Sequence, residues 1–256
     1  MIDITPIPAF QDNYHWLISG NGDAWVVDPG DGEAVKQALH ERSLALSGIL
    51  ITHHHWDHVN GIEALLSDNL IVAGPSLKKH PLVNTPLSNG DFITICGEQF
   101  TVFETPGHTL NHIVYYAQLS HQSPLLFCGD TLFAGGCGRL FEGTPKQMYQ
   151  SLTKLAELPE DTQIYCAHEY TAANLAFAST LEPKNSKLKT RITDVHSLRK
   201  EGKPTIPSTL SVELETNPFL RTGSEEIINS ARKNNPAVAI EPESIFAELR
   251  SMKDSF

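Results

Sequence analysis

One short segment constrains the fold and the chemistry of this chain more than any other: residues 53–58, with the sequence His-His-His-Trp-Asp-His. The apolar residues 48–51 before it predict a short buried strand, and residues 61–66 after it predict the start of a helix. The segment therefore lies on a loop at the carboxyl end of a strand, where open α/β folds place their sites.

The spacing within this segment is typical of a metal site. Side chains alternate along an extended chain, so His53 and His55 face the same side and can bind one ion together, whereas His54 points away. Asp57 and His58 follow a turn of the chain and can reach a second position. Imidazole and carboxylate groups suit zinc, iron or manganese. The alternatives are a chance histidine-rich tract or a purification-tag remnant, but a tag stands at a terminus.

Side chains of the same kind follow three other predicted strands. His108, Asp130 and His168 each stand one to four residues beyond the end of an apolar strand. Each of them alone is weak evidence, because a lone histidine in such a turn is usually structural or merely exposed. Together with the first segment, they supply five histidines and two aspartates.

These seven side chains are sufficient for two metal ions with four protein ligands each. We expect one ion to be bound by His53, His55, His108 and Asp130, and the other by Asp57, His58, His168 and Asp130, which bridges the two. Two dipositive ions against two carboxylates and one hydroxide leave a positive centre, which attracts an anionic substrate. A water shared by such ions loses its proton near neutral pH and becomes a nucleophile.

Composition restricts the remaining possibilities. A chain of 256 residues with 40% hydrophobic residues can form one large or two modest domains without crosslinks. The net charge of −11 argues against a nucleic-acid partner. No segment has the length of a membrane-spanning helix, and the N-terminal residues lack the features of a signal peptide. The four cysteines form no Cys-x-x-Cys pair, so we expect reduced thiols in a cytoplasmic protein.

Nothing in the sequence requires more than a monomer.

The order of apolar patterns predicts two regions. Strands are expected in the first region at 14–19, 24–28, 48–51, 70–73, 91–95, 99–104, 113–117, 125–128 and 163–166, the last clear strand, with helices over 33–44 and 145–158. Residues 75–90 predict an irregular surface segment. Helices are expected in the second region over 171–181, 186–200, 225–233 and 243–253. We therefore predict a catalytic domain over 1–170 and a mainly helical domain over 171–256.

The motifs occur in the order of a known superfamily. His-x-His-x-Asp-His, Gly107-His108-Thr109, Gly129-Asp130-Thr131 and a late histidine together resemble the metallo-β-lactamase fold, a four-layer αββα sandwich of the α/β class. Five further segments resemble glyoxalase II, the hydroxyacylglutathione hydrolases: residues 8–14, 27–30, 128–133, 135–139 and 167–171. The resemblance extends from residue 1 to 256, including the helical tail.

The resemblance implies a thioesterase that hydrolyses S-D-lactoylglutathione to D-lactate and glutathione, the second step of methylglyoxal detoxification. It implies two divalent metal ions, zinc first among the candidates, on the seven residues above. It also implies that glutathione is bound by Arg139, Phe141, Tyr170, Arg250 and Lys253. Position 139 is Arg where some relatives have Lys, which should keep the contact. Position 141 is Phe where some have Tyr, so a hydroxyl contact is lost.

Asp57 and Asp130 are the expected catalytic carboxylates: Asp130 bridges the ions, and Asp57 also orients the nucleophile. A thiol has a pKa of about 8.5, so the thiolate can leave without a strong general acid. His112 is expected to support the site or to be simply structural. Other histidines are expected to be structural or surface residues: His15, His40, His54, His80, His121 and His196.

Three alternatives to this function remain open. Sulfur dioxygenases share the fold and a similar motif, and they use one iron to oxidise glutathione persulfide, but they typically lack a long helical tail. A generic β-lactamase fits the cytoplasmic character and the basic residues less well. A metal-stabilised binding module without activity predicts a missing ligand, and none of the seven is missing.

Overall fold

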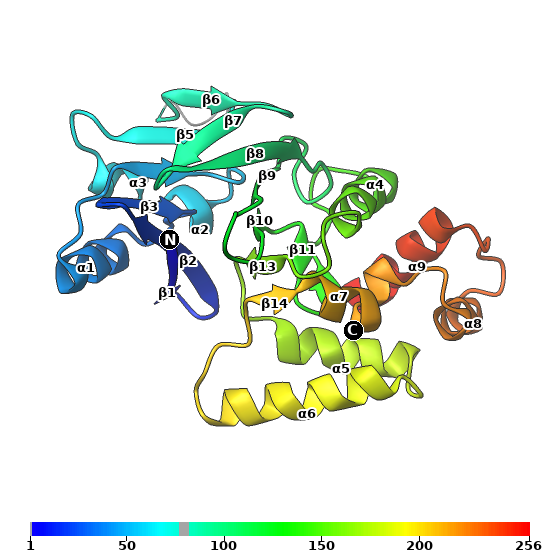
Figure 1. The fold of residues 1–256 in the computed structure, drawn as a ribbon. Coiled ribbons are helices and arrows are strands. Elements are labelled where there is room, and N and C mark those ends of the chain that lie inside the picture. The colour runs from blue at the N-terminus through cyan, green and yellow to red at the C-terminus, as the bar shows by residue number, and fades with distance from the viewer. Residues whose placement is uncertain (1, 77–81) are drawn as a thin grey trace. The chain divides into compact units, whose positions relative to one another are not determined.

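The structure is a computed structural model that describes residues 2–76 and 82–256 (Figure 1). The chain forms two compact units, Met1–Glu104 with Asn111–Gly129, and Thr105–Leu110 with Asp130–Phe256. None of the helices in the described part of the chain has the length and apolar character that a bilayer crossing demands.

The first unit contains a mixed six-stranded sheet. Its strands lie in the order of the sequence: β1 (Asp3–Ala9), β2 (Asn13–Gly20), β3 (Asp23–Val27), β4 (Gly48–Leu50), β5 (Ile71–Pro75) and β6 (Thr85–Leu87). The first three strands pair antiparallel, and β3 to β6 pair in parallel. Parallel neighbours need crossover connections. Helix α1 (Gly32–Arg42) connects β3 to β4, and the short helices α2 (Trp56–Val59) and α3 (Ile62–Leu65) lie between β4 and β5. The buried face of α1, with Val35 and Leu39, packs on Val26 and Ile49 of the sheet.

A second group of strands in this unit is antiparallel throughout. It comprises β7 (Phe92–Ile95), β8 (Glu98–Glu104), β9 (Ile113–Ala117) and β10 (Leu125–Gly129). The β7–β8 hairpin turns at Cys96 and Gly97, with φ values of 52° and 85°, as a two-residue hairpin turn requires. Tyr115 of β9 donates a hydrogen bond of 2.7 Å to Ile51 O, so the second group of strands packs against the first sheet. Burial raises the pKa of the Tyr115 hydroxyl well above its usual value.

The second unit is mainly helical. Its strands are short: β11 (Leu132–Phe133), β12 (Gly136–Cys137), β13 (Gln163–Cys166) and β14 (Ser208–Thr209). Its helices are α4 (Pro145–Ala156), α5 (Thr171–Leu181), α6 (Ser186–Lys200), α7 (Leu210–Thr216), the 3-10 helix η1 (Pro218–Leu220), α8 (Glu225–Asn234) and α9 (Pro242–Asp254). Helix α4 begins with a capping box between Thr144 and Gln147 and has Pro145 in its first turn. Helices α5 and α6 pack side by side through Leu175 and Val195 (Figure 1).

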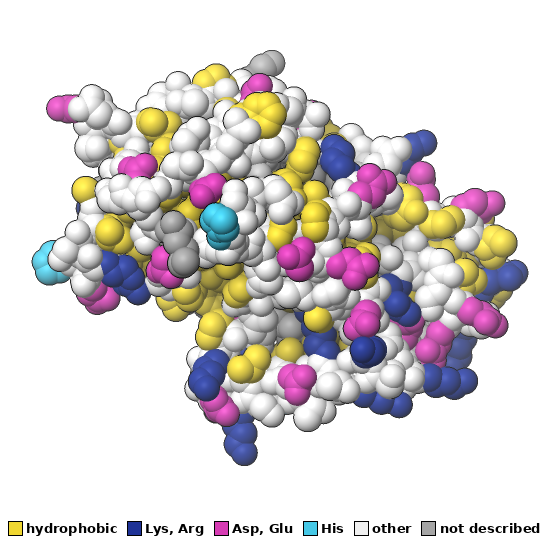
Figure 2. Space-filling model, in the orientation of Figure 1, with side chains coloured by type: hydrophobic (Ala, Val, Ile, Leu, Met, Phe, Trp, Pro, Cys, Tyr) yellow, Lys and Arg dark blue, Asp and Glu magenta, His cyan; other side chains and the backbone are white. Residues whose placement is uncertain are grey.

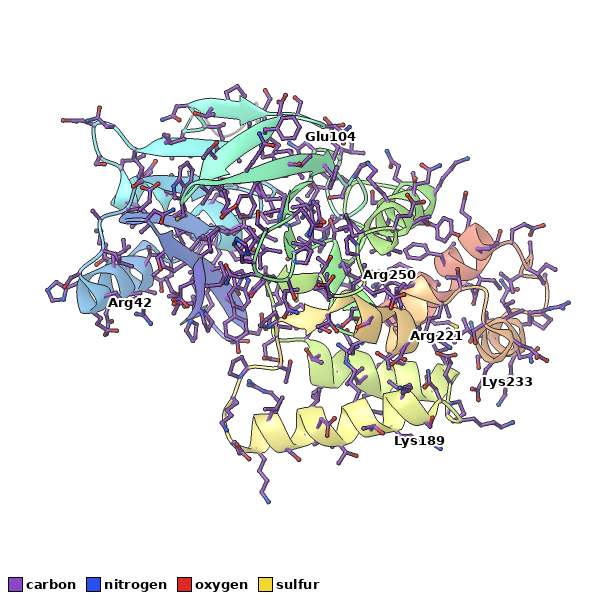
Figure 3. All side chains as sticks on the ribbon, in the orientation of Figure 1. Arg42, Glu104, Lys189, Arg221, Lys233 and Arg250 are labelled. Atoms are coloured by element: carbon purple, nitrogen blue, oxygen red, sulfur yellow. The ribbon has the colours of Figure 1, made fainter. Side chains whose placement is uncertain are left out.

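Two ion pairs hold the helices of the second unit together. Glu213 of α7 is fully buried and accepts hydrogen bonds from Arg191 of α6, from Ser208 Oγ at 2.5 Å and from Gly135 N at 2.8 Å. Arg221, labelled in Figure 3, donates through Nε and Nη2 to both carboxylate oxygens of Glu182, each at 2.9 Å. The first pair joins α6 and α7 to the β11–β12 turn, and the second joins the end of η1 to the end of α5.

Most predicted elements are confirmed with ends shifted by a few residues. Several elements were not predicted individually: β1, β11, β12, β14, α2, α7 and η1. The prediction that residues 163–166 form the last strand is wrong, because β14 pairs antiparallel with β13. Two-residue strands carry no hydrophobic period, and the buried charge of Glu213 interrupts the apolar face of α7.

The prediction of an irregular segment over 75–90 is wrong at residues 85–87, which form β6. Asn84 positions this strand, because its side chain accepts from Val72 N and donates to Leu70 O, both at 2.9 Å. Residues 77–81 of that segment, including His80, lie outside the described residues.

Candidate active site

The histidine segment lies where the structure turns from β4 into α2. His53 is fully buried, and its Nε2 lies 3.0 Å from His55 Nδ1. The two rings therefore converge as the spacing predicts. His54 turns away, and its Nδ1 lies 3.3 Å from Asn111 Oδ1.

A buried carboxylate, Asp28, organises this segment from the end of β3. It accepts hydrogen bonds from Thr52 N and Thr52 Oγ1, both at 2.7 Å, and from His58 Nδ1 at 3.0 Å. His58 therefore carries its proton on Nδ1, and its Nε2 faces Asp57 Oδ2 at 3.4 Å. Such carboxylate–histidine pairs fix the tautomer and the orientation of metal-binding histidines.

The Thr52 hydroxyl connects Asp28 to His53 and determines which ring nitrogen of His53 carries the proton. Because it donates its proton to Asp28, it can only accept from His53 Nδ1, which lies 3.0 Å away. The lone pair of His53 is then on Nε2, the atom that approaches His55. Atoms of Asp28, His53 and His58 also lie within 4.8 Å of one another, as in a metal triad. Asp28 already accepts three hydrogen bonds, however, so it supports the ligands instead of joining them.

Asp57 is held from the start of β2. Asn13 donates through Nδ2 to Asp57 Oδ2 at 2.9 Å. The backbone approaches closely at the same place, because a Cβ on Gly30 would lie 1.9 Å from Asp57 O. The Asp57 side chain is 30% exposed, so it is fixed in position and still reachable from solvent.

The second unit places two of the other predicted ligands, His108 and His168, beside the third, Asp130. Asp130 Oδ2 lies 3.3 Å from His108 Nε2, and Asp130 Oδ1 lies 3.3 Å from His168 Nε2. His108 donates through Nδ1 to Arg139 O at 2.7 Å, which turns its Nε2 toward Asp130. The ring of His168 stacks on Tyr170 with centroids 4.7 Å apart. Within this unit, one carboxylate thus joins two histidines, as a bridging ligand would.

Two predicted glutathione residues lie beside these ligands. Phe141 is 62% exposed, and its ring contacts the His108 ring edge-on at 5.3 Å. The Tyr170 ring contacts the rings of both His168 and Phe133. Both aromatic rings therefore adjoin a predicted metal ligand in the second unit.

The three predicted basic residues differ in exposure. The Arg139 side chain is 56% exposed, and its Nε donates to Asp254 Oδ1 at 3.1 Å. Arg250, labelled in Figure 3, is buried and donates through its two terminal nitrogens to Cys137 O and Asp254 Oδ1, both at 3.0 Å. Lys253 donates to Ala173 O at 3.2 Å. Burial, and then the neighbouring Arg250, lower the pKa of Lys253.

Three supporting residues were missed by the sequence analysis: Asp28, Thr52 and Asn13. Asp28 stood at the end of a predicted strand, and both Asp28 and Asn13 lay in segments singled out only by resemblance. His112 is buried and stacks on His53 with centroids 4.9 Å apart. His15 is buried too, and burial followed by the charge of His58 lowers its pKa to about 4.

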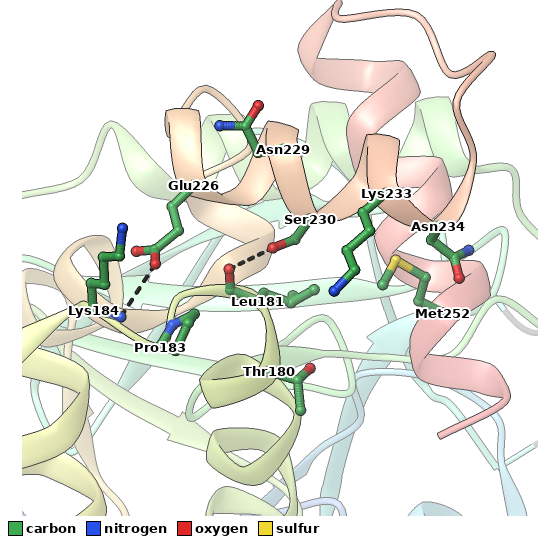
Figure 4. Close-up of a pocket in the computed structure, with 10 residues that line it drawn as sticks. All are labelled: Thr180, Leu181, Pro183, Lys184, Glu226, Asn229, Ser230, Lys233, Asn234 and Met252. Carbon is green, nitrogen blue, oxygen red and sulfur yellow. Dashed lines mark hydrogen bonds between the residues drawn. The ribbon is translucent and has the colours of Figure 1, made fainter.

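A hollow elsewhere in the second unit is a poor candidate for the site. It measures about 580 Å³ and lies between the end of α5, α8 and α9 (Figure 4). Two dashed bonds in Figure 4 pair polar groups within it, Lys184 N with Glu226 and Ser230 Oγ with Leu181 O. Its ten lining residues include none of the predicted ligands or glutathione residues, so the convergent side chains described above remain the candidate site.

Comparison with known proteins agrees with the fold and the ligand pattern. Residues 12–168 match the family model of the metallo-β-lactamase superfamily. The crystal structure of TTHA1623 in a di-iron-bound form is 25% identical, with a TM-score of 0.60, and covers 85% of this chain and 100% of its own. The chain is therefore a metallo-β-lactamase-fold protein, and the predicted fold class is confirmed.

Residues beyond 168 indicate which family of this superfamily the chain belongs to. Residues 169–256 match the model described as hydroxyacylglutathione hydrolase C-terminus. The hydroxyacylglutathione hydrolases of Ectopseudomonas mendocina (strain ymp) and Shewanella halifaxensis (strain HAW-EB4) are each 48% identical, over 100% of both chains. The chain belongs to the hydroxyacylglutathione hydrolase family, as the resemblance indicated, and is a metal-dependent hydrolase.

Proposed function

We propose that this chain hydrolyses S-D-lactoylglutathione and related 2-hydroxyacylglutathiones to glutathione and the free 2-hydroxy acid. The observation that carries the proposal is the complete set of seven ligand-type side chains, with the ring nitrogens of His53, His58 and His108 oriented by hydrogen bonds. The full-length relatives named hydroxyacylglutathione hydrolases support the choice of substrate. They do not favour the sulfur dioxygenase alternative.

The seven side chains fit two divalent ions. We assign His53, His55 and His108 to one ion, Asp57, His58 and His168 to the other, and Asp130 to both. Imidazole and carboxylate ligands suit zinc, and also iron or manganese, and the di-iron form of TTHA1623 supports a dinuclear centre. When bound, two such ions activate a water molecule and polarise the thioester carbonyl.

The surrounding residues orient this reaction. Asp28 and Thr52 hold His58 and His53 in the tautomers that present Nε2. Asn13 holds the carboxylate of Asp57 in one orientation, so Asp57 can align the attacking water as well as bind metal. The departing thiolate has a conjugate acid of pKa about 8.5, so no residue is required as a strong general acid.

Residues of the second unit supply the chemistry that glutathione requires. Its carboxylates are suited to the exposed guanidinium of Arg139, and its backbone can pack on Phe141 and Tyr170. Arg250 is buried, so we propose that it supports the loop of Arg139 through Cys137 O and Asp254. Lys253 supplies a further positive charge for the carboxylates of glutathione.

We divide the chain into a catalytic domain over 1–170 and a glutathione-binding helical domain over 171–256. The two family matches meet close to this boundary, at residues 168 and 169.

We further propose a monomeric, cytoplasmic enzyme without nucleic-acid or membrane partners. On the face seen in Figure 2, Lys and Arg side chains are interspersed with Asp and Glu, unlike a basic nucleic-acid surface. All four cysteines are free and buried. Burial raises the pKa of Cys137 to about 11 and of Cys166 to about 12, so these thiols stay protonated and unreactive.

The test is product analysis with purified protein. We expect S-D-lactoylglutathione to yield glutathione and D-lactate in equal amounts, without oxygen uptake. Oxygen consumption with glutathione persulfide, and no thioester hydrolysis, would replace this proposal by the dioxygenase alternative.

A further inference from the structure

One carboxylate oxygen in the second unit accepts hydrogen bonds from two arginines. Arg139 donates to Asp254 Oδ1 through Nε at 3.1 Å, and Arg250 donates to the same oxygen through Nη2 at 3.0 Å. Asp254 is the last residue of α9, and its side chain is 38% exposed. Hydrogen bonds between ionised partners are roughly twice as strong as neutral ones. Asp254 therefore connects the exposed guanidinium of Arg139 to the buried guanidinium of Arg250.

Arg250, labelled in Figure 3, is the fixed side of this connection. Its side chain is 7% exposed, its Nη1 donates to Cys137 O at 3.0 Å, and its guanidinium lies 5.2 Å from the centroid of the Phe219 ring. A buried charge that loses its partners is strongly destabilising, so these contacts hold Arg250 in one orientation. The carboxylate of Asp254 is held in turn, because it is bound to a guanidinium that cannot move aside.

Arg139 is the exposed side of the connection. Its carbonyl oxygen accepts from His108 Nδ1 at 2.7 Å, so its backbone is anchored, and Asp254 anchors the guanidinium at the far end of the side chain. A long surface side chain otherwise samples many rotamers, and ordering it on binding weakens affinity. The bond to Asp254 is made by Nε. The terminal nitrogens Nη1 and Nη2 are then the pair of donors that can meet both oxygens of another carboxylate.

We propose that Asp254 is a positioning residue for substrate binding, which holds Arg139 in the orientation that presents Nη1 and Nη2 to a carboxylate of glutathione. The proposal rests on the function proposed above. Asp254 does not cancel the attraction of this cluster for an anion, because Arg139 and Arg250 supply two positive charges against its one negative charge. In this role Asp254 contacts no substrate and acts through Arg139.

The kinetic test uses Asp254→Asn, which keeps the size of the side chain and removes its charge. We expect KM for S-D-lactoylglutathione to rise about 3- to 10-fold, the cost of ordering one long side chain on binding, with kcat unchanged. Glu243→Gln is the matched control, because it removes the same charge from the first turn of α9 and should leave KM unchanged. Variants are compared at equal metal content.

Arg139→Ala separates positioning from a general structural effect. Loss of the guanidinium should itself raise KM. In the Arg139→Ala background, Asp254→Asn should then have little further effect, because the group that it positions is gone. Effects of the two substitutions that multiply instead would show that Asp254 does not act through Arg139.

The order of the Arg139 side chain is a second readout that does not depend on turnover. We expect the Nε–H bond of Arg139 in wild type to show an order parameter of about 0.85 by nitrogen NMR relaxation, as rigid backbone does. Asp254→Asn should lower it below about 0.6, the range of flexible groups. Glu243→Gln should leave the order parameter at its wild-type value.

An unchanged or lower KM in Asp254→Asn, or an unchanged order parameter, would overturn the positioning role. If Asp254→Asn does not fold, the wild-type order parameter decides, because a mobile Arg139 in wild type overturns the role as well. These results are distinct from failure of the proposed function. A wild-type protein that does not hydrolyse S-D-lactoylglutathione contradicts that function, whereas the relaxation experiment still decides whether Asp254 positions Arg139.

Discussion

At the scale of single residues, buried polar groups account for the order of the candidate site. A carboxylate that is removed from water is stabilised only when hydrogen bonds replace its hydration. Asp28 is 2% exposed, and its partners Thr52 and His58 satisfy it fully. The same bonds determine which nitrogen of His58 is available for metal. One carboxylate thus orders both the buried interior and a proposed metal ligand.

Asp28→Asn should weaken metal binding about 10- to 100-fold, as loss of an outer carboxylate partner does at other histidine sites. The amide keeps the size of the side chain but not the charge that orients His58. Competition with a chromophoric chelator measures the affinity. Asp3→Asn, an exposed carboxylate in the same unit, is the control. An unchanged affinity in Asp28→Asn would contradict the supporting role.

His15 should make folding stability depend on pH. Its pKa is about 4 when folded and 6.5 when exposed, so below pH 6.5 the unfolded chain binds a proton that the folded chain does not. The stability due to neutral His15 is therefore fully present above pH 6.5 and is lost as the pH falls toward 4. Between pH 7 and pH 5, the free energy of unfolding should fall by about 2 kcal/mol more in wild type than in His15→Gln. Urea unfolding of both proteins checks this, and parallel pH profiles would contradict it.

At the scale of secondary-structure elements, buried contacts position the loops that carry site residues. The β11–β12 turn precedes the loop of Arg139, and Glu213 of α7 accepts from its Gly135 N. The Arg139 carbonyl in turn accepts from His108. Helix α7 therefore contributes to the site without providing a ligand.

Glu213→Gln should destabilise the fold by about 3 kcal/mol, because it leaves the nearly buried Arg191 charge without its carboxylate. Glu215→Gln on the same helix is the matched control. Its ion pair with Lys187 is exposed, with side chains 49% and 67% accessible, and should contribute less than about 1 kcal/mol. Denaturant unfolding curves compare the two variants. Equal midpoints would show that the Glu213 network does not stabilise the helices.

Gly138→Ala should displace the same loop. A Cβ at Gly138 would lie 1.9 Å from Asp130 O and 3.1 Å from His108 Nδ1, and backbone cannot yield as a flexible side chain does. We expect loss of metal and at least about a tenfold loss of turnover, since small misplacements in a site are costly. Gly223→Ala, with nothing within 4 Å of its added Cβ, should behave as wild type. Metal analysis after desalting is the measurement.

Elements with a hydrophobic period were predictable, and those without it were not. Helices α1, α4 and α5 and strands β8 and β9 follow their apolar patterns within a few residues. Strand β6 escaped prediction because its position depends on Asn84, a side-chain contact to β5 and its flanking residue Leu70.

At the scale of the whole molecule, the candidate site combines residues that are far apart in the sequence, and the positions of predicted strand ends were enough to propose seven of them. All seven proposed ligands follow strand ends, and a strand end is visible in the sequence. Asp28 was not recognisable as a partner of His58, because 30 residues and a helix separate them. Arg250 was predicted only from the resemblance, which did not show that its side chain is buried.

The central proposal is that seven ligand-type side chains bind two metal ions, with His53 at one ion, His168 at the other and Asp130 at both. It is tested most directly by measuring metal content and S-D-lactoylglutathione turnover together, in wild type and in His53→Ala and His168→Ala. We predict two ions per wild-type chain, about one in each variant, and loss of at least about a hundredfold in kcat. Turnover should also disappear on chelation and return with the second equivalent of metal. Full activity with a single bound ion, or normal turnover in either variant, would contradict the account.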